Sequence, residues 1–426
     1  MSAGPIRLPG SMRVPGPIRV LHVVRVMKRA GVETWLMHLL RHFDRGEIAI
    51  DILVYSDEAG DYDDEVRALG ARIFRCPHPR RPWRYASHFL RVLRTEGPWD
   101  VVHSHNYFFS GVDMRLAAYA GVPQRIAHMH PVRDIEDGRL LRGLYRRWMS
   151  RWIVRYSDRI VAPSQASLEA FAQYADLSGK AQAVVRNCVD AVAMSAAVDR
   201  MRVRRELGLP ADRPLIAYVA RFVPHKNHVL MAELADALER MGIGAHFVAA
   251  GTDGPARAAF EQRVAGRGDF SVFLNHADIQ PLLRASDLFF FPSTEEGFGV
   301  VAIEAAAAGL PVVATNLPGI REACCAGQRA FLFEPNDTRA AAQNVARLLS
   351  DAELYRDLRD EGVRWAKEFS VEAVAKQLRA IYAGARTEGG ARAEGGARTE
   401  SGARTESAAR GTSSVGPVSN AVRGQA

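Results

Sequence analysis

The chain has 426 residues, more than one ordinary hydrophobic core accommodates, so its length predicts two domains. Apolar residues make up 48% of the sequence, which is typical of globular proteins and permits two well-formed cores. The net charge of +8 comes without any block of about five or six like charges. This distribution argues against nucleic acid as a partner.

The cysteines and the N-terminus both predict a cytoplasmic protein. The first residues lack the apolar core of a signal peptide, and no run of about eighteen apolar residues follows. The cysteines show neither metal-type nor redox spacing, so we expect reduced, buried thiols. They are Cys76, Cys188, Cys324 and Cys325.

Both ends of the chain have the composition of disordered segments. Residues 1–16 are rich in Gly and Pro, and from Gly384 a six-residue repeat of the type GARTEG continues with almost no large apolar side chains. Such segments cannot bury enough apolar surface to offset the entropy lost on ordering. Disorder is therefore predicted for 1–16 and 384–426.

Between these ends, short apolar runs alternate with helical patterns, which predicts parallel sheets covered on both faces. The first set of runs comprises residues 18–24, 50–55, 71–75, 100–105, 125–130, 158–164 and 181–187. The pattern restarts after a polar linker with residues 214–221, 245–251, 270–275, 287–293, 310–315 and 330–335. The prediction is an α/β protein with two doubly wound Rossmann-like domains, 17–190 and 191–368. Ligands of such sheets bind beyond the carboxyl ends of the strands, here in an interdomain cleft.

The run 287–293 is followed by a glycine turn and a predicted helix from about Val300 to Ala308. Gly297 and Gly299 let the backbone approach a ligand closely, and the first N–H groups of the helix favour an anion. Glu304 lies in the second turn, and its carboxylate can accept hydrogen bonds from paired hydroxyls, as on a ribose. The alternative is an exposed helix start at which Glu296 interacts with the helix dipole.

Two further groups of polar residues lie at predicted strand ends. Arg221 and Lys226 suit a diphosphate, although cations in such loops are more often solvated surface charges. Histidines alternate at 103 and 105 and again at 128 and 130, which places each pair on one face of a sheet. A metal site is one interpretation; without Asp, Glu or Cys nearby, buried and hydrogen-bonded histidines are the favoured one.

The stretch 295–315, EEGFGVVAIEAAAAGLPVVAT, resembles the signature of GT-B retaining glycosyltransferases of the GT4 family. In that family two glutamates have seven residues between them, as Glu296 and Glu304 do. The resemblance implies that Glu296 contacts the donor sugar and that Glu304 binds the ribose. It also assigns to donor binding the turn residues Gly297, Phe298, Gly299 and Val300.

Other segments extend the resemblance over roughly residues 17–383. Arg221 and Lys226 match the diphosphate-binding element of the family, with Ala220 in place of a glycine. Gly31 matches a glycine loop that packs against the donor phosphates or the acceptor, and His130 matches a histidine that contacts the donor sugar; His105 is assigned to the acceptor side. Residues 369–383 resemble a closing helix that crosses back to the first domain.

The resemblance implies a retaining glycosyltransferase without metal or cofactor. The donor is a sugar linked to UDP or GDP, and the acceptor is a hydroxyl of a glycan or lipid-linked molecule in polysaccharide or glycoconjugate biosynthesis. A nucleotide-sugar epimerase of the same architecture and a non-catalytic nucleotide-sugar-binding protein remain as alternatives. A two-carboxylate glycosidase fits less well, because Arg221 and Lys226 face the two glutamates.

Residues 138–156 predict a basic amphipathic helix, with arginines interspersed among apolar residues that include Trp148 and Trp152. This pattern suits contact with a membrane surface, which would place the protein at the inner face of the membrane. A helix that packs on a sheet needs a similar apolar stripe, and this is the favoured interpretation.

Overall fold

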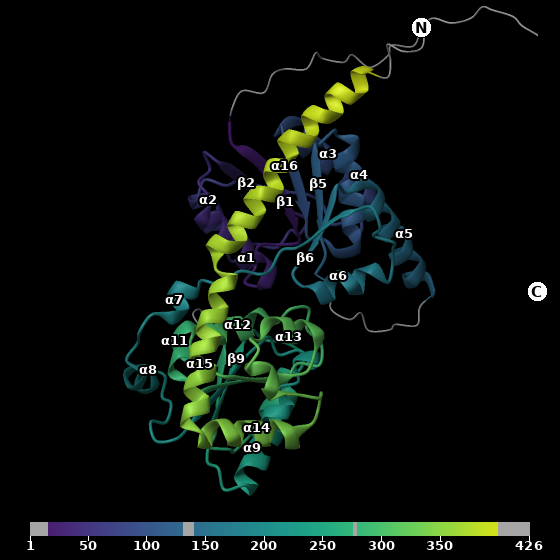
Figure 1. Ribbon diagram of the computed structural model, residues 1–426. Coiled ribbons are helices and arrows are strands. Elements are labelled where there is room, and N and C mark those ends of the chain that lie inside the picture. The colour runs from purple at the N-terminus through teal and green to yellow at the C-terminus, as the bar shows by residue number, and fades with distance from the viewer. Residues whose placement is uncertain (1–15, 131–139, 276–278, 399–426) are drawn as a thin grey trace, which may run out of the picture. The chain divides into compact units, whose positions relative to one another are not determined.

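The computed structural model describes residues 16–130, 140–275 and 279–398, and these form two parallel α/β domains (Figure 1). Residues 1–15, 131–139, 276–278 and 399–426 lie outside the described residues, and so do most of the predicted terminal tails. Both sheets belong to one compact unit, residues 1–385. The predicted fold class is confirmed.

The first sheet has seven parallel strands in the order β3-β2-β1-β4-β5-β6-β7. The strands are β1 (Ile18–Val24), β2 (Ile48–Val54), β3 (Ile73–Arg75), β4 (Val101–Ser104), β5 (Gln124–His128), β6 (Arg159–Ala162) and β7 (Ala181–Val184). Its helices are α1 (Gly31–His42), α2 (Asp63–Ala68), α3 (Pro82–Thr95), α4 (Ser110–Tyr119), α5 (Leu140–Tyr156) and α6 (Gln165–Ala172), with the 3₁₀ turn η1 (Tyr107–Phe109). Each parallel pair needs a crossover connection, which these helices supply.

The second sheet has six parallel strands in the order β10-β9-β8-β11-β12-β13. They are β8 (Leu215–Val219), β9 (His246–Gly251), β10 (Phe270–Leu274), β11 (Leu288–Phe291), β12 (Val312–Thr315) and β13 (Leu332–Phe333). The helices are α9 (Val229–Arg240), α10 (Arg257–Val264), α11 (Gln280–Ala285), α12 (Val300–Ala307), α13 (Pro318–Ala323), α14 (Thr338–Ser350) and α15 (Ala352–Ala366), with 3₁₀ turns η2 (Pro224–Lys226), η3 (Gln328–Phe331) and η4 (Lys367–Phe369). Two short helices, α7 (Ala191–Ser195) and α8 (Arg200–Glu206), occupy the predicted linker.

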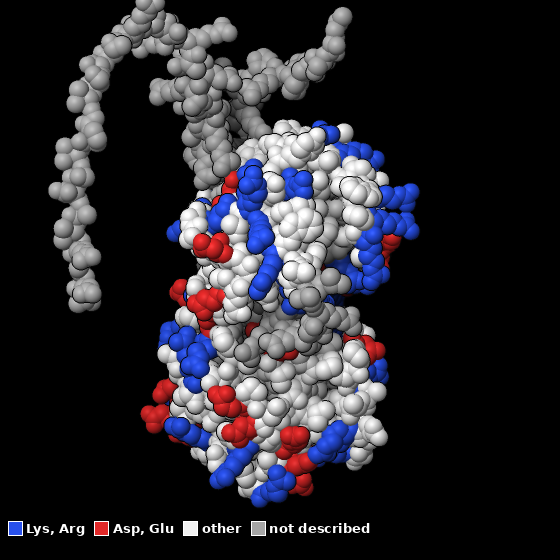
Figure 2. Space-filling view, turned by 90° about the vertical axis from the view of Figure 1, so that its right-hand side faces the viewer, with Lys and Arg blue, Asp and Glu red and all other residues white. Residues whose placement is uncertain are grey.

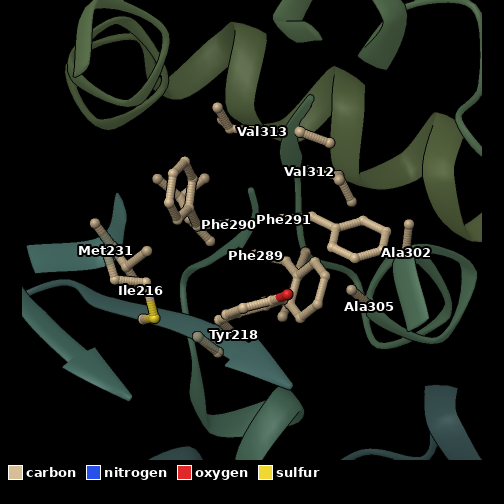
Figure 3. Close-up of a cluster of buried hydrophobic side chains, with 14 of the residues drawn as sticks. Ile216, Tyr218, Met231, Phe289, Phe290, Phe291, Ala302, Ala305, Val312 and Val313 are labelled. Carbon is tan, nitrogen blue, oxygen red and sulfur yellow. The ribbon is translucent and has the colours of Figure 1, made fainter. Parts of the chain in front are cut away.

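The core of the second domain forms because its central strand is apolar on both faces. Phe289, Phe290 and Phe291 of β11 are all fully buried, and Tyr218 of β8 lies beside them (Figure 3). Ala302 and Ala305 of α12 pack against this cluster with their small side chains. The helix therefore lies close to the sheet, and its first turn follows the end of β11 directly.

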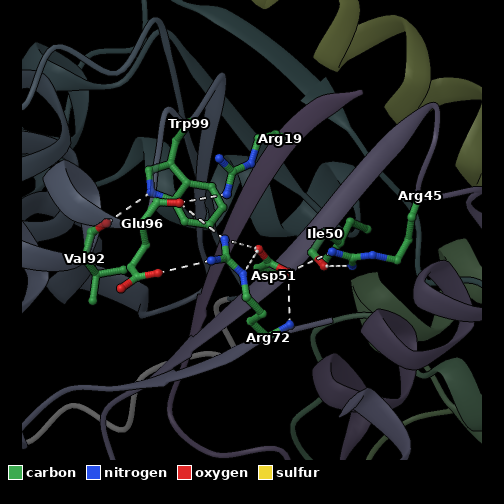
Figure 4. A network of polar contacts seen from close by, with 8 residues as sticks. All are labelled: Arg19, Arg45, Ile50, Asp51, Arg72, Val92, Glu96 and Trp99. Atoms are coloured by element: carbon green, nitrogen blue, oxygen red, sulfur yellow. Dashed lines mark hydrogen bonds and ion pairs between the residues drawn. The ribbon is translucent and has the colours of Figure 1, made fainter. Parts of the chain in front are cut away.

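A buried carboxylate interrupts the apolar pattern of β2. Asp51 is 2% exposed and accepts hydrogen bonds from Arg45 Nη2 (3.1 Å) and from Arg72 Nε (3.0 Å) and Nη2 (2.8 Å). Arg72 also forms an ion pair with Glu96 (Figure 4). A buried charge is tolerated where partners neutralise it, so these contacts account for Asp51 as a structural residue.

The last helix differs from its prediction. We expected a closing helix over 369–383 and disorder from Gly384, but α16 runs from Val371 to Arg398. Ala, Arg and Glu, which lie between the glycines of the repeat, are good helix formers, and the helix continues although large apolar residues are absent from 384–398. The packed part carries Val374, Leu378 and Tyr382 into the core cluster of the first sheet (Figure 1).

Candidate active site

A glycine turn joins β11 to α12, as predicted. Gly299 has φ 79° and ψ 47°, in the left-handed region, and precedes the first helical residue, Val300. A Cβ at this position would lie 2.9 Å from the ring of Phe291. No side chain of the described residues caps this helix start, so its first N–H groups are available to an anion.

Two of the predicted site residues contact each other. Lys226 Nζ forms an ion pair with Glu296 Oε2, and both side chains are largely buried. The loop of Lys226 is fixed beside the turn because Tyr218 donates a hydrogen bond to the Lys226 carbonyl (2.7 Å) and the Thr294 N–H donates one to the His225 carbonyl (2.8 Å). The sequence placed Lys226 and Glu296 at one site, but it did not indicate this pairing.

Arg221 and Glu304, unlike Lys226 and Glu296, are not joined to an oppositely charged residue of the described chain. Arg221 follows β8 and is exposed, and no described residue forms an ion pair with it. Glu304 is half-buried in the second turn of α12, and no described cation lies within ion-pair distance of its carboxylate. Burial raises the pKa of Glu304 to about 7. Within the described ranges, neither residue has the charged protein partner that a purely structural role would supply.

Two glycines support the Arg221 loop and were not singled out in the sequence. A Cβ at Gly251 would lie 1.8 Å from the Ala220 carbonyl oxygen, and one at Gly254 would lie 2.2 Å from the Phe222 carbonyl oxygen. The loop between β8 and α9 therefore packs directly on glycine backbone. The signal that was overlooked is a pair of glycines at and just beyond the end of a buried strand.

In the first domain, Gly31 is the first residue of α1, and nothing lies within 4 Å of the Cβ position that another residue would occupy. Glu33, in the same turn, is half-buried, and burial raises the pKa of its carboxyl to about 7. Open space at the start of this helix is compatible with the predicted approach of a ligand to Gly31.

The predicted histidines lie in or just beyond β4 and β5, and Trp35 of α1 packs against the rings of His103, His105 and His128. His105 and His130 are joined by a hydrogen bond of 3.0 Å between Nδ1 and Nε2. His103 and His128 lie deeper, and His22, which the sequence did not indicate, pairs in register with His103 across β1 and β4. Two trios, His22–His103–His105 and His105–His128–His130, each place one ring nitrogen per residue within 4.8 Å of the others.

Hydrogen bonds connect the two sets of elements within residues 1–385. Ser164, the N-cap of α6, donates to the Gly297 carbonyl (2.9 Å), so this glycine carbonyl is engaged by protein. Glu322 of α13 accepts from the backbone N–H groups of Gln165 (2.8 Å) and Ala166 (2.7 Å), a favourable position for a carboxylate. No hydrogen bond or ion pair of the described chain joins Gly31, His105 or His130 to the group around Glu296.

The two sheets, the glycine turn and the paired glutamates together define the class of GT-B glycosyltransferases. The solved structure of Alr3699/HepE from Anabaena, in complex with UDP and glucose, has this fold: it covers 86% of this chain and 100% of its own, with a TM-score of 0.73 and 20% identity. Residues 29–192 match the family model Glycosyltransferase Family 4, and residues 199–365 match Glycosyl transferases group 1.

Sequence similarity to two glycosyltransferases identifies the family of this chain. The chain is 31% identical to EpsF of Bacillus subtilis, a protein assigned as a glycosyltransferase, over 68% of this chain and 77% of that protein. It is 32% identical to D-inositol 3-phosphate glycosyltransferase of Geodermatophilus obscurus over 70% of each chain. The chain belongs to the group 1 glycosyl transferases of the GT4 family, and it is a glycosyltransferase.

Two remaining predictions concern the cysteines and the membrane. All four cysteines are buried and form no disulfide, as expected. Within the described ranges, no helix combines the length and the apolar character needed to span a bilayer. The start of the predicted helix 138–156 lies outside the described residues, and α5 begins at Leu140.

Proposed function

We propose that the second domain binds a sugar linked to UDP or GDP, and that the sugar is transferred with retention of its anomeric configuration to a hydroxyl acceptor. The observation that carries this proposal is Glu304, a half-buried carboxylate without a cation among the described residues, beside the uncapped start of α12. Such a group gains most from hydroxyl donors of a ligand.

Two cations support a proposed diphosphate position at the same edge of the sheet. The exposed Arg221 is available to a phosphate, and Lys226 can exchange Glu296 for a second phosphate oxygen. Both would stabilise the charge that develops on the diphosphate as the sugar leaves. Glu296, released from the ion pair, is then free to accept hydrogen bonds from sugar hydroxyls, as the family resemblance implies.

The first domain supplies the other side of the proposed site. Gly31 offers an unobstructed helix start, and His130 offers a neutral imidazole for a sugar hydroxyl. Both ring nitrogens of His105 are bonded to other histidines, so we propose His105 as a neighbour of the acceptor and not as its hydrogen-bond partner. HepE, which shares the fold, binds UDP and glucose or UDP-glucose in its solved complexes. The acceptor we propose is a glycan or a lipid-linked molecule, in polysaccharide or glycoconjugate biosynthesis.

A screen of nucleotide sugars tests the donor assignment. Melting temperature and donor hydrolysis are measured with UDP- and GDP-linked sugars, and the product of the best donor is analysed by NMR. We expect one base to stabilise the protein and the released or transferred sugar to keep its anomeric configuration. Inversion would contradict the retaining mechanism, and an isomerised nucleotide sugar would indicate the epimerase alternative.

We also propose that transfer proceeds without a metal ion or other cofactor. Arg221, Lys226 and the start of α12 already place positive charge beside the proposed diphosphate, which is the role a divalent cation takes elsewhere. Dialysis against EDTA should therefore leave the transfer rate within about twofold of its original value. A loss that added Mg²⁺ or Mn²⁺ restores would contradict this proposal.

A second proposal concerns α5 and the inner face of the membrane. Met149 and Ile153 are buried, as helix packing requires, but Leu144, Tyr145 and Trp148 are 55%, 42% and 52% exposed. Arginines lie among these residues in the sequence. Figure 2 shows Lys and Arg side chains gathered on the first domain, on the side of the molecule that faces the viewer. Exposed aromatic and basic residues on one helix suit an anionic membrane surface.

Vesicle sedimentation tests this surface. The protein should bind vesicles that contain phosphatidylglycerol and not those of phosphatidylcholine alone. A double substitution, Leu144→Ser with Trp148→Ser, should release it, whereas Trp83→Ser, which changes another exposed tryptophan, should not. Equal binding of both variants would place the contact elsewhere.

A further inference from the structure

The histidines beneath α1 and α16 form one continuous hydrogen-bonded chain with Tyr382. Its first links join His130 Nε2 to His105 Nδ1 (3.0 Å) and His105 Nε2 to His22 Nδ1 (3.0 Å). The next joins His22 Nε2 to the hydroxyl of Tyr382 (3.3 Å), which is also bonded to His103 Nδ1 (2.9 Å).

The last link joins His103 Nε2 to His128 Nδ1 (3.2 Å), deep in the sheet. Period-two spacing on three neighbouring strands places the five imidazoles on one face. The tyrosine reaches them from α16, which crosses the first sheet (Figure 1).

The imidazoles of this chain are neutral near pH 7. Burial lowers the pKa of His22 to about 3 and that of His130 to about 4. Burial, followed by the neighbouring histidines, lowers the pKa values of His103, His105 and His128 well below the usual range. Each ring therefore carries one N–H and one bare nitrogen.

Counting protons leaves only two orderly arrangements. Five neutral imidazoles and one tyrosine bring six protons, and the chain has five links. One proton is left over at an end of the chain, either on His130 Nδ1 or on His128 Nε2. Because every link between histidines joins an Nδ1 to an Nε2, the first arrangement makes all five histidines Nδ1–H tautomers, and the second makes all five Nε2–H tautomers.

The environments of the two ends distinguish these arrangements. His128 Nε2 is buried, and no described residue lies within hydrogen-bonding distance of it. A proton there would leave a buried donor without an acceptor, which is rare in folded proteins. His130, at the other end, is partly exposed, so a donor there can reach water or a ligand.

We propose that Tyr382 and the four inner histidines hold His130 as the Nδ1–H tautomer, so that it presents a hydrogen-bond donor to the ligand. Tyr382 is then a positioning residue supplied by α16. The nitrogen that carries the proton is set by the bond that the other nitrogen makes. The consequence for transfer, donation to a sugar oxygen, rests on the proposed function, whereas the tautomer itself does not.

Nitrogen-15 NMR of the histidine rings tests the tautomer directly. Signals are assigned with single His→Gln variants, and protonated and bare ring nitrogens are distinguished by their chemical shifts. In the wild-type protein the five rings should all be Nδ1–H. Five Nε2–H rings, or a charged imidazolium among them, would overturn the proposal whatever the enzyme transfers.

Removal of one hydroxyl tests the role of Tyr382. In the proposed arrangement the Tyr382 hydroxyl donates to His22 Nε2 and so favours the bare form of that nitrogen. Tyr382→Phe removes this donor, which weakens the preference for Nδ1–H along the His22–His105–His130 segment, and the His130 signals should move toward a tautomer mixture. The donor kcat/KM should fall about threefold to tenfold, the size expected for one neutral hydrogen bond. The control is Tyr85→Phe, which removes another buried hydroxyl, bonded to Asp113, and should leave the His130 signals unchanged.

Zinc titration distinguishes the proton chain from a metal site. A metal ion would need the lone pairs of a trio and would displace the protons from its links. We expect no saturable change in the histidine signals with Zn²⁺ at micromolar concentration. Stoichiometric binding that shifts His22, His103 and His105 together would overturn the proposal. An unchanged tautomer with an unaffected kcat/KM in Tyr382→Phe would overturn the positioning role alone.

Discussion

Asp51 of β2 and Glu304 of α12 are both carboxylates in apolar elements, but their surroundings differ. Asp51 is held by Arg45 and Arg72 and needs nothing from outside the protein. Glu304 is half-buried in α12 and has no cationic partner among the described residues. The protein completes the contacts of Asp51, whereas the contacts of Glu304 are left open in the described chain, which is why we propose Asp51 as a structural charge and Glu304 as a binding one.

The largest effect should come from the cations of the proposed site. Arg221→Ala or Lys226→Ala should lower turnover by on the order of 10²-fold, as for the loss of donors that stabilise the transition state. Because Arg221 has no structural partner in the described chain, its variant should melt at the wild-type temperature. Lys226→Ala also leaves Glu296 without its partner.

Steady-state transfer kinetics and thermal melting measure both effects. Arg240→Ala, an exposed arginine at the end of α9, is the matched control and should keep full activity. Activity within a few-fold of wild type in Arg221→Ala would remove this residue from the site and would weaken the contrast with Asp51.

Asp51→Asn should show the opposite pattern. Removing the charge leaves two arginines without their carboxylate, and the free energy of unfolding should fall by about 2 kcal/mol, less than for a fully buried pair because both arginines are partly exposed. Urea unfolding measures this loss, and transfer per folded molecule should not change. Loss of activity at unchanged stability would mean that β2 also serves the site.

Glu304→Gln should weaken nucleotide binding without destabilising the protein. A charge-assisted hydrogen bond contributes roughly 1.5–3 kcal/mol, so the Kd for the nucleoside diphosphate should rise by about tenfold or more. Calorimetric titration measures the affinity, and thermal melting measures the stability. Unchanged affinity with a clear drop in stability would assign Glu304 to the same structural class as Asp51.

The pH dependence of stability sharpens this comparison. Because burial raises the pKa of Glu304 from 4.5 to about 7, the folded protein retains a proton between these values that the unfolded chain has released. The contribution of Glu304 to the free energy of unfolding therefore falls as the pH rises through that window. The wild type should lose stability relative to Glu304→Gln between about pH 5 and pH 7.5, and Glu33, present in both proteins, cancels in the difference. A constant difference would contradict the raised pKa.

The smallest effect should come from the C-terminal repeat. Truncation after Ala385 removes no residue of the buried core clusters, so the melting temperature and transfer should remain unchanged. Truncation after Lys376 is the contrasting variant, because it also removes Leu378, Ile381 and Tyr382 and should lower stability by roughly 5 kcal/mol. A large loss with the shorter truncation would mean that the repeat packs or binds.

Much of the fold was predictable because apolar runs fix where buried strands lie. Every strand predicted within the described residues occurs, with ends that differ by a few residues, and Val300 begins α12 as predicted. The positions of Glu296 in the turn and Glu304 in the helix followed from the glycines of the turn and from Gly309 and Pro311 after the helix. The end of α16 was mispredicted, because a low content of large apolar residues indicates poor packing but does not prevent a helix, even one with glycines among its Ala, Arg and Glu residues.

The sequence by itself determined two Rossmann-like domains and a glycosyltransferase signature, since periodicity and motif spacing are local properties of the chain. Only the tertiary structure decided which charges are paired: Lys226 with Glu296 and Asp51 with two arginines, whereas Glu304 has no cation in the described chain. It also brought His22 and Tyr382, 360 residues apart, into one chain of hydrogen bonds. Partners of this kind come from strand order and helix packing, so no local pattern encodes them.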